Sequence, residues 1–240
     1  MTQNTFRTPA GCEVTAVTAA GMREVDRVAV EEVGLQLLQM MENAGRALSR
    51  HVREAHDDGS VVVVAGNGGN GGGGLTCARH LANRDVPVRV VLDREPAELS
   101  GAAAHQCRIL EAMDLGVATG PEAVSRFDEP TVLVDALIGY GVSREVRPPA
   151  ADYVRELNAA SGPVVSLDVP SGMDATTGDT RGVRVHPDRT LTLALPKTGL
   201  DAVEEALSLA DIGIPAAVYD RLDIDYEPPF DETDRVELVG

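Results

Sequence analysis

Hydrophobic positions along this 240-residue chain follow two periods, one typical of helices and one typical of buried strands. Apolar residues recur at helical spacing over residues 22–33 and about 35–55, after an extended arm at residues 1–17. Continuous β-branched and aliphatic runs then predict strands buried on both faces, as in a parallel sheet. The predicted strands are 61–65, 86–92, 131–137, 163–168 and 189–195. The further predicted helices are 75–83, 96–115, 150–160 and one that begins near Asp201.

Because strands and helices alternate, the chain is predicted to fold through right-handed βαβ units. The predicted fold is α/β and Rossmann-like, with three α/β/α layers around a doubly wound, mostly parallel sheet. The sequence contains no internal repeat and no linker-like segment. We therefore expect a single domain over residues 1–240, with its core at about 19–222 and a peripheral tail at 227–240.

The charge balance excludes several classes of partner. There are 38 Asp and Glu against 21 Lys and Arg, so the formal net charge is −17. Nucleic-acid binders need a basic surface to replace counterions on phosphates, and no segment is rich in Lys or Arg. Anionic membrane surfaces are disfavoured for the same reason, and no apolar run reaches the length of about 18 residues that a span requires. Three widely spaced cysteines and the lack of a secretion signal in residues 1–20 indicate a cytoplasmic protein.

The basic residues are almost all arginine, because Lys197 is the single lysine among the 21 Lys and Arg. An excess of acids with few lysines is typical of proteins dissolved in concentrated salt, where dense carboxylates keep the surface hydrated. We therefore interpret the composition as halophile-type and expect solubility and activity to persist in molar KCl.

Four predicted strand ends carry unusual segments. In open α/β sheets, ligands bind beyond the carboxyl ends of the strands, and this topology would bring all four segments to one edge. The segments are 66–74 (G-N-G-G-N-G-G-G-G), 135–141 (D-A-L-I-G-Y-G), 168–174 (D-V-P-S-G-M-D) and 196–200 (P-K-T-G-L).

The first segment contains the dinucleotide-binding pattern G-x-G-x-x-G at Gly66, Gly68 and Gly71, with Asp93 at the end of the following strand. Glycines in this place let a pyrophosphate approach the backbone at a helix N-terminus. The missing G-K-[ST] excludes a P-loop. The pattern alone favours an NAD-dependent oxidoreductase, with a flexible glycine turn as the alternative.

The other segments supply charged side chains. Asp135 and Asp168 each end a predicted strand, where a carboxylate can bind a cation, act as a base or cap the next turn. Lys197 lies in the fourth segment, and a lysine kept where arginine is otherwise used suggests a role for a compact ammonium group.

Taken in order, these motifs resemble the YjeF N-terminal domain family, the NAD(P)H-hydrate epimerases. Residues 41–46 (M-E-N-A-G-R) and 194–199 (A-L-P-K-T-G) complete the resemblance, which covers about residues 19–222. It implies an isomerase that interconverts the R and S epimers of hydrated NADH and NADPH, so that a dehydratase can act on the S form. The chain ends before any kinase-like dehydratase domain, so only the epimerase half is expected.

The resemblance also implies roles for particular residues. Asp168 would face the reacting ring. Because one carboxylate near the ring can serve as acid and base in turn, we expect Asp168 to be catalytic, with Lys197 as an electrostatic or hydrogen-bonding helper. Asn70, Asp135 and Ser171 would supply oxygen ligands to a potassium ion. The protein is expected to be a homodimer, with the N-terminal helices as a possible interface. The hydrated dinucleotide would be contacted by Gly69, Asn70, Gly71, Gly72, Gly73, Gly139, Tyr140, Gly141, Val142, Ser143, Arg144, Glu145 and Asp168.

Three positions depart from the usual pattern of that family. Gly69 stands where an Asn is usual, Gly73 where an Asp is usual, and Tyr140 where a Thr is usual. Contacts through backbone N–H groups survive these changes, whereas side-chain contacts are lost. The alternatives to an epimerase are therefore an NAD-dependent oxidoreductase and a non-catalytic nucleotide-binding scaffold of the same fold.

Overall fold

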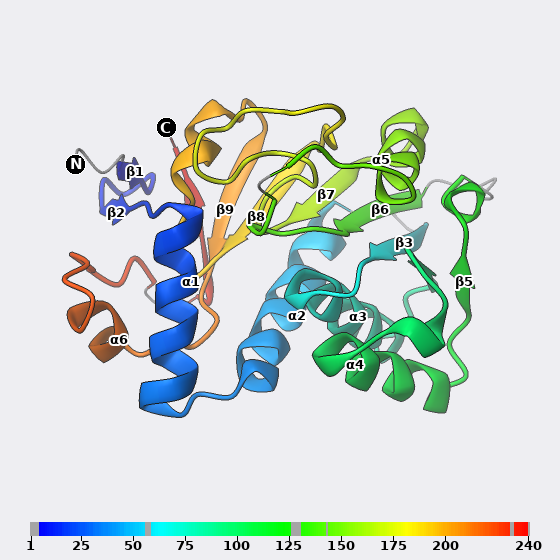
Figure 1. Ribbon diagram of the computed structural model, residues 1–240, viewed down its shortest axis with the longest axis horizontal. Coiled ribbons are helices and arrows are strands. Elements are labelled where there is room, and N and C mark those ends of the chain that lie inside the picture. Colours follow the sequence, from blue (N-terminus) through cyan, green and yellow to red (C-terminus); the bar gives the residue numbers. More distant parts are fainter. Residues whose placement is uncertain (1–4, 56–58, 126–130, 143, 231–232, 240) are drawn as a thin grey trace.

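The computed structural model describes residues 5–55, 59–125, 131–142, 144–230 and 233–239 and has the predicted three-layer α/β/α architecture (Figure 1). Its main sheet has the order β10-β9-β8-β7-β6-β3-β4-β5, in which only β10 is antiparallel to its neighbour among the strands described. The strands of this sheet are β3 Ser60–Ala65, β4 Val88–Leu92, β5 Val117–Thr119, β6 Thr131–Ala136, β7 Val164–Leu167, β8 Arg189–Leu193, β9 Ala206–Ala210 and β10 Arg235–Leu238. The predicted fold class is confirmed.

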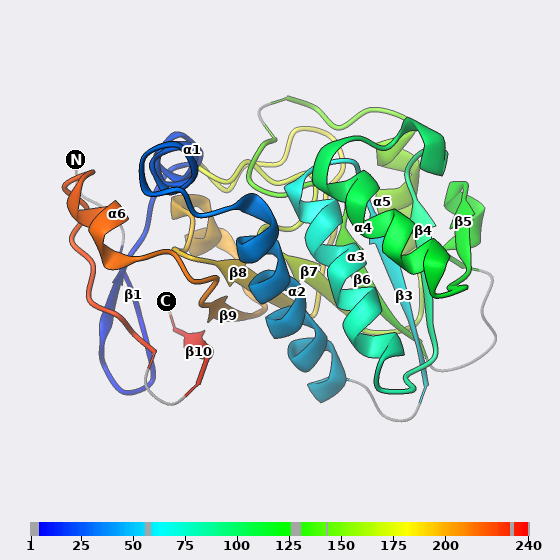
Figure 2. The same cartoon turned by 90° about the horizontal axis from the view of Figure 1, so that it is seen from below.

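Helices cover both faces of the sheet (Figure 2). The helices α2, α3 and α4 lie on one face, and α5 lies on the other. The N-terminal arm forms a two-stranded sheet of β1 (Thr5–Arg7) and β2 (Glu13–Thr15). The helices are α1 Ala19–Arg27, the π-helix η1 Val28–Val33, α2 Leu37–Glu54, α3 Gly69–Ala82, α4 Gly101–Ala112, α5 Ala150–Ala159 and α6 Ala216–Asp220, with 3-10 turns η2 Pro96–Glu98, η3 Pro121–Ala123 and η4 Thr198–Ala202.

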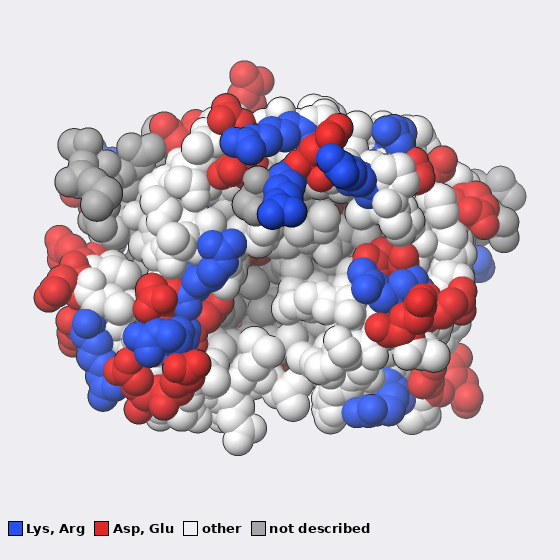
Figure 3. Space-filling view, viewed as in Figure 1, with Lys and Arg blue, Asp and Glu red and all other residues white. Residues whose placement is uncertain are grey.

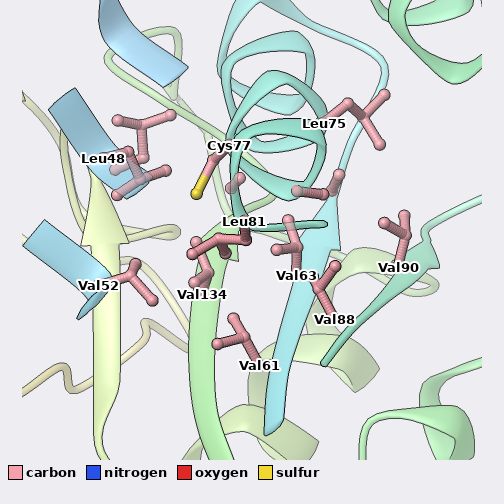
Figure 4. Close-up of a cluster of buried hydrophobic side chains, with 14 of the residues drawn as sticks. Leu48, Val52, Val61, Val63, Leu75, Cys77, Leu81, Val88, Val90 and Val134 are labelled. Atoms are coloured by element: carbon pink, nitrogen blue, oxygen red, sulfur yellow. The ribbon is translucent and has the colours of Figure 1, made fainter. Parts of the chain in front are cut away.

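The core under α2 and α3 is built from small aliphatic side chains (Figure 4). Val61 and Val63 of β3 point toward this face, and Val62 and Val64 point toward α5 on the other, so that all four valines are fully buried. Alternate side chains of a strand face opposite sides of a sheet, and both sides here are covered. This is why the strand shows as a continuous apolar run in the sequence.

The helix α3 begins earlier than its sequence indicates. It starts at Gly69, inside the glycine run, whereas a turn was predicted up to residue 74. Glycine is an unfavourable helix residue by about 1 kcal/mol relative to alanine. Close packing overrides that preference, because a Cβ on Gly71 would lie 1.7 Å from the Gly66 carbonyl oxygen and one on Gly74 would lie 2.4 Å from the Ala136 Cβ.

The C-terminal part also differs from expectation. The helix predicted from Asp201 is wrong: η4 ends at Ala202, and β9 follows as a strand paired in parallel with β8. Short apolar runs do not distinguish a buried strand from a helix. Within the tail expected at 227–240, β10 forms the edge strand beside β9. The helix predicted over 96–115 is divided into η2 and α4, since Gly101 adopts a positive φ of 56°.

Candidate active site

The candidate site lies where the strand order reverses, between β3 and β6. The chain winds one way from β3 to β4 and β5, and the other way from β6 to β7 and β8. Such a reversal point is the usual ligand crevice of an open parallel sheet. The two glycine turns meet there, because the Gly66 N–H donates to the Ala136 carbonyl at 3.1 Å. A cavity of about 710 Å³ opens beside them, and Figure 3 shows a hollow bordered by acidic and basic side chains on this face.

A buried ion pair lies in the wall of this cavity. Asp168, directly after β7, is 4% exposed, and Lys197, which follows β8, is 1% exposed. The ammonium group of Lys197 donates to Asp168 Oδ1, to the Leu193 carbonyl at 2.9 Å and to Thr192 Oγ1 at 3.3 Å. All three N–H bonds are therefore used, which a compact ammonium permits and a planar guanidinium does not. This explains in physical terms why a lysine stands here.

The geometry of Asp168 is unusual and is fixed from several sides. Its φ is 69°, in the left-handed region that non-glycine residues seldom adopt. Oδ1 accepts from Lys197 and from the Leu193 N–H at 3.3 Å, and Oδ2 accepts from the Tyr140 N–H at 3.3 Å. Strained backbone held by surrounding contacts is often found at functional sites. The carboxylate is thus held in a fixed orientation facing the cavity.

The glycine turns leave room for a ligand at the helix N-terminus. Gly69, Asn70 and Gly73 from α3 and Gly139, Tyr140 and Gly141 after β6 line the cavity. A Cβ on Gly139 would lie 3.2 Å from both Asn70 Oδ1 and Asp168 Oδ2, so this glycine separates the two side chains. Free N–H groups at a helix N-terminus attract anions such as phosphate. The arrangement is suited to a ligand with phosphates at α3 and a reacting group at Asp168.

Asp135 and Ser171 form a cluster behind the cavity wall. Asp135 is fully buried, and its carboxylate accepts from Ser171 Oγ at 2.5 Å, Ser166 Oγ at 2.8 Å and the N–H groups of Ser171 and Leu137. Burial raises the pKa of Asp135, and these neutral donors partly offset the rise. Because no cationic side chain is among these partners, the buried negative charge fits a nearby monovalent cation.

Asn70 lies on the cavity side of this cluster. The Ile138 N–H donates to Ser171 Oγ at 2.9 Å, and the next residue, Gly139, faces Asn70. Asn70 Nδ2 is buried without a hydrogen-bond partner among the described residues, so protein contacts do not fix this amide. One carboxylate, one hydroxyl and one amide are oxygen donors suited to a hard cation. Across the described ranges, no group of three or more His, Cys, Asp or Glu could hold a metal ion.

The remaining predicted contact residues are placed differently. Gly71 and Gly72 are buried within α3 and pack against Gly66 and Met41, so their backbone positions the turn. Val142, Arg144 and Glu145 are outside the set of residues that line the cavity. Ser143 lies outside the described residues.

Two acidic residues that line the cavity were not predicted as part of an epimerase site. Asp93 faces the cavity from the end of β4, but both of its carboxylate oxygens accept from Arg94, at 2.8 and 2.9 Å. Asp26 comes from α1, and its Oδ2 accepts the hydroxyl of Tyr140. The contact joins residues 114 positions apart, and a lone Asp in an amphipathic helix gives no local signal of it.

The family model described as YjeF-related protein N-terminus matches residues 37–199. An NAD(P)H-hydrate epimerase from Dehalogenimonas lykanthroporepellens is 43% identical over 232 residues, which span 94% of this chain and 93% of that protein. A second protein of that name, from Rhodopirellula baltica, is 34% identical and covers 83% of this chain and 84% of its own. The chain therefore belongs to the YjeF-related N-terminal family, as its motifs predicted.

Some other similar proteins are longer than this chain. A bifunctional NAD(P)H-hydrate repair enzyme from Salinibacter ruber is 38% identical, and the match covers 85% of this chain but 42% of that protein. The crystal structure of a yeast protein superposes with a TM-score of 0.80 at 24% identity, covering 92% of this chain and 99% of the yeast chain, so the fold is the same. In the described part of the chain, no helix is long and apolar enough to cross a membrane.

Proposed function

We propose that this protein is an isomerase that interconverts the R and S epimers of hydrated NADH and NADPH, a repair of damaged nicotinamide cofactors. The observation that carries the proposal is the buried Asp168–Lys197 pair, which faces the same cavity as the N-terminus of α3. Relatives named NAD(P)H-hydrate epimerase that match nearly the whole chain support it. The oxidoreductase alternative is weakened because Arg94 occupies both oxygens of Asp93.

The reaction inverts a ring carbon that carries a hydroxyl beside the ring nitrogen. Inversion requires that a proton leave oxygen and another reach nitrogen as a bond opens and re-forms, and general acid–base groups accelerate such steps by about 10²–10⁴-fold. We assign Asp168 as the base, because Lys197 and the Tyr140 N–H orient its carboxylate in the cavity wall. Lys197 stabilises that anion without direct proton transfer.

We also propose how a negative protein holds a negative dinucleotide. The turn at Gly69, Asn70 and Gly73 would bind the phosphates through N–H groups at the start of α3, supported by the helix dipole. The turn at Gly139, Tyr140 and Gly141 would cover the ligand from the β6 side. Arg23, which lines the cavity near Tyr140, adds positive charge to its wall.

Asn70, Asp135 and Ser171 are proposed to hold a potassium ion. The fit rests on the fully buried Asp135 carboxylate, whose partners are neutral donors. When bound, the ion would balance the Asp135 charge and add positive potential beneath the two glycine turns.

The expected homodimer and cytoplasmic location belong to this proposal as well. Val30 and Val33 of η1 and Leu37 and Leu38 of α2 are exposed large apolar residues on neighbouring N-terminal helices, which favours a contact with a second copy. The buried free thiols of Cys77 and Cys107 suit a reducing compartment. Light scattering tests the dimer: a monomeric mass would contradict it.

The decisive experiment supplies R-hydrated NADH together with a dehydratase that consumes only the S form. We expect the R form to be consumed only when this protein is added, and the same test with hydrated NADPH compares the two cofactors. Hydride transfer with a simple substrate would instead support an oxidoreductase. Tight binding of the hydrate without any change in epimer ratio would support a non-catalytic scaffold.

A further inference from the structure

A second carboxylate faces the cavity from a helix rather than from a strand end. Asp26 and Asp168 both line the cavity, but they come from different elements, α1 and the end of β7. Tyr140 connects them: its hydroxyl donates to Asp26 Oδ2, and its backbone N–H donates to Asp168 Oδ2 at 3.3 Å. Tyr140 therefore contacts both carboxylates, one through its hydroxyl and the other through its backbone N–H.

The surroundings of the two carboxylates differ. Asp168 is paired with the ammonium of Lys197, a charged partner. Asp26 accepts its hydrogen bond from a neutral phenol instead. Two titratable groups in one site with unlike environments commonly divide the acid and base roles between them.

Burial and the neighbouring charged and titratable groups act on the pKa of Asp26 in both directions. Burial raises the pKa of Asp26; the Tyr140 hydrogen bond and Lys197 lower it, and Asp168 raises it. The charge of Asp26 also reaches Tyr219 of α6, whose pKa it helps to raise, and Arg23 lies 5.8 Å from the centre of the Tyr140 ring. Burial is the largest of these effects, so the neutral acid is favoured over a wider pH range than for an exposed aspartate.

We propose, building on the epimerase function above, that Asp26 is a second catalytic residue that gives a proton to the ring nitrogen of the hydrated nicotinamide while Asp168 takes the proton of the ring hydroxyl. Tyr140 is a positioning residue, because it holds Asp26 Oδ2 and so leaves Oδ1 to carry the transferred proton. Tyr140 stands where the family usually has Thr, and in this chain its hydroxyl is the group that holds Asp26.

The step balances without an oxidant or a metal. The hydroxyl proton moves to Asp168, the C–O bond becomes a carbonyl, and the C–N bond breaks with its electron pair going to nitrogen, which takes the Asp26 proton. Rotation of the freed aldehyde presents its other face. The nitrogen then attacks that face, returns its proton to Asp26, and the oxygen regains a proton from Asp168.

The test compares kcat over a range of pH for Asp26→Asn, Asp26→Glu and Tyr140→Phe in the coupled epimerase assay. Asparagine keeps the shape and the acceptor for Tyr140 but carries no acidic proton, so we expect kcat to fall by about 10²-fold with little change in KM. In the unsubstituted protein, kcat should decline at alkaline pH, because Asp26 then loses the proton that it donates. Asp26→Asn should not show this decline, whereas Asp26→Glu should keep both the decline and part of the activity.

Tyr140→Phe separates this role from a merely structural one. Removing the phenol removes a hydrogen bond that lowers the pKa of Asp26, so the alkaline decline in kcat should move to higher pH. Two controls should leave the profile unchanged: Glu24→Gln, on the exposed face of α1, and Tyr153→Phe, which loses a phenol hydrogen bond to the Leu92 carbonyl away from the cavity.

Two results would overturn the proposal. An Asp26→Asn variant with the kcat and the alkaline decline of the unsubstituted protein would show that Asp26 supplies no proton. An unsubstituted protein that binds the hydrate without epimerising it would overturn the proposed function itself, and this assignment with it. Melting curves of each variant identify any loss of activity that comes from unfolding.

Discussion

At the scale of single residues, the Asp168–Lys197 pair is held by contacts from several sides. Both side chains are at least 95% buried, and between them they make hydrogen bonds to Thr192, Leu193 and Tyr140. Removing two charges from water is costly. A buried ion pair is favourable only when further hydrogen bonds satisfy the remaining N–H donors and carboxylate lone pairs. The pair is thus better explained by catalysis than by stability.

This leads to a prediction about single and double substitutions. Asp168→Asn and Lys197→Met each leave one buried charge without its partner, so each should lower the free energy of unfolding by about 3–5 kcal/mol. The double variant removes both charges and should be more stable than the sum of the two losses predicts. Denaturant titration measures the stabilities, and the epimerase assay should find Asp168→Asn and the double variant inactive. Additive losses of stability, or near-normal turnover by Asp168→Asn, would contradict this interpretation.

At the scale of elements, the start of α3 combines tolerant and intolerant glycines. A Cβ at Gly69 would have no atom within 4 Å, whereas one at Gly71 would lie 1.7 Å from the Gly66 carbonyl oxygen. The first turn of this helix is therefore free on the cavity side and tightly packed on the sheet side.

Substitutions at these two glycines should have opposite outcomes. Gly69→Asn, which introduces the side chain usual in the family, should melt within a few degrees of the unsubstituted protein and lower KM for the hydrate by adding a polar contact. Gly71→Ala should cost about 3 kcal/mol or more, because the backbone itself must move. Thermal melting and KM check both, with Gly68→Ala as a second substitution into open space. Equal melting temperatures for Gly69→Asn and Gly71→Ala would contradict the packing argument.

The edge strand β10 is attached to α2 through buried and exposed polar contacts. Arg235 donates to His51 Nδ1 at 2.8 Å and pairs with Glu54 at 2.7 Å, while Arg50 pairs with Asp234. His51 is 3% exposed, and burial, followed by the charges of Arg235 and Arg189, lowers its pKa to about 3. The neutral imidazole is therefore the form that accepts from Arg235.

This contact predicts a pH dependence of stability. The unfolded chain protonates His51 near its ordinary pKa of about 6.5, and the folded chain does so only near 3, so stability is lost as pH falls below about 6.5. Between pH 7.5 and 5.5 the loss should be about 1 kcal/mol. His51→Gln keeps an acceptor for Arg235 but does not titrate, and its stability should be flatter over that range in denaturant titrations. The exposed His186, changed to Gln, serves as the control, and an unchanged slope in His51→Gln would refute the assignment.

The sequence predicts the parts of this site that depend on local pattern and leaves out those that depend on packing. The apolar run of β3 and the Asp168 and Lys197 motifs are local, and the structure brings them to one cavity. The helical start of α3 was missed because glycine propensity argues against it and only the sheet behind it decides otherwise. Asp26 was missed because its partner Tyr140 lies 114 residues away.

At the scale of the whole molecule, the net charge of −17 has two separable consequences. Repulsion among surface carboxylates destabilises any compact chain, and salt screens that repulsion over a length that falls to about 3 Å at 1 M. This effect is general and does not distinguish one monovalent cation from another. The proposed site at Asn70, Asp135 and Ser171 would by contrast be selective, because a fixed set of oxygens fits some ions better than others.

Melting temperature in KCl, NaCl and choline chloride at equal ionic strength distinguishes these effects. We expect a rise from dilute buffer to 1 M in all three salts, because each screens the surface, and an additional rise in KCl from occupation of the site. Asp135→Asn should abolish the additional rise while keeping the common one, since one charge among 38 acids hardly changes the repulsion. Identical curves in the three salts would refute the potassium site. A protein most stable in dilute buffer would refute the halophile-type interpretation and leave the potassium site to be judged by the difference between salts alone.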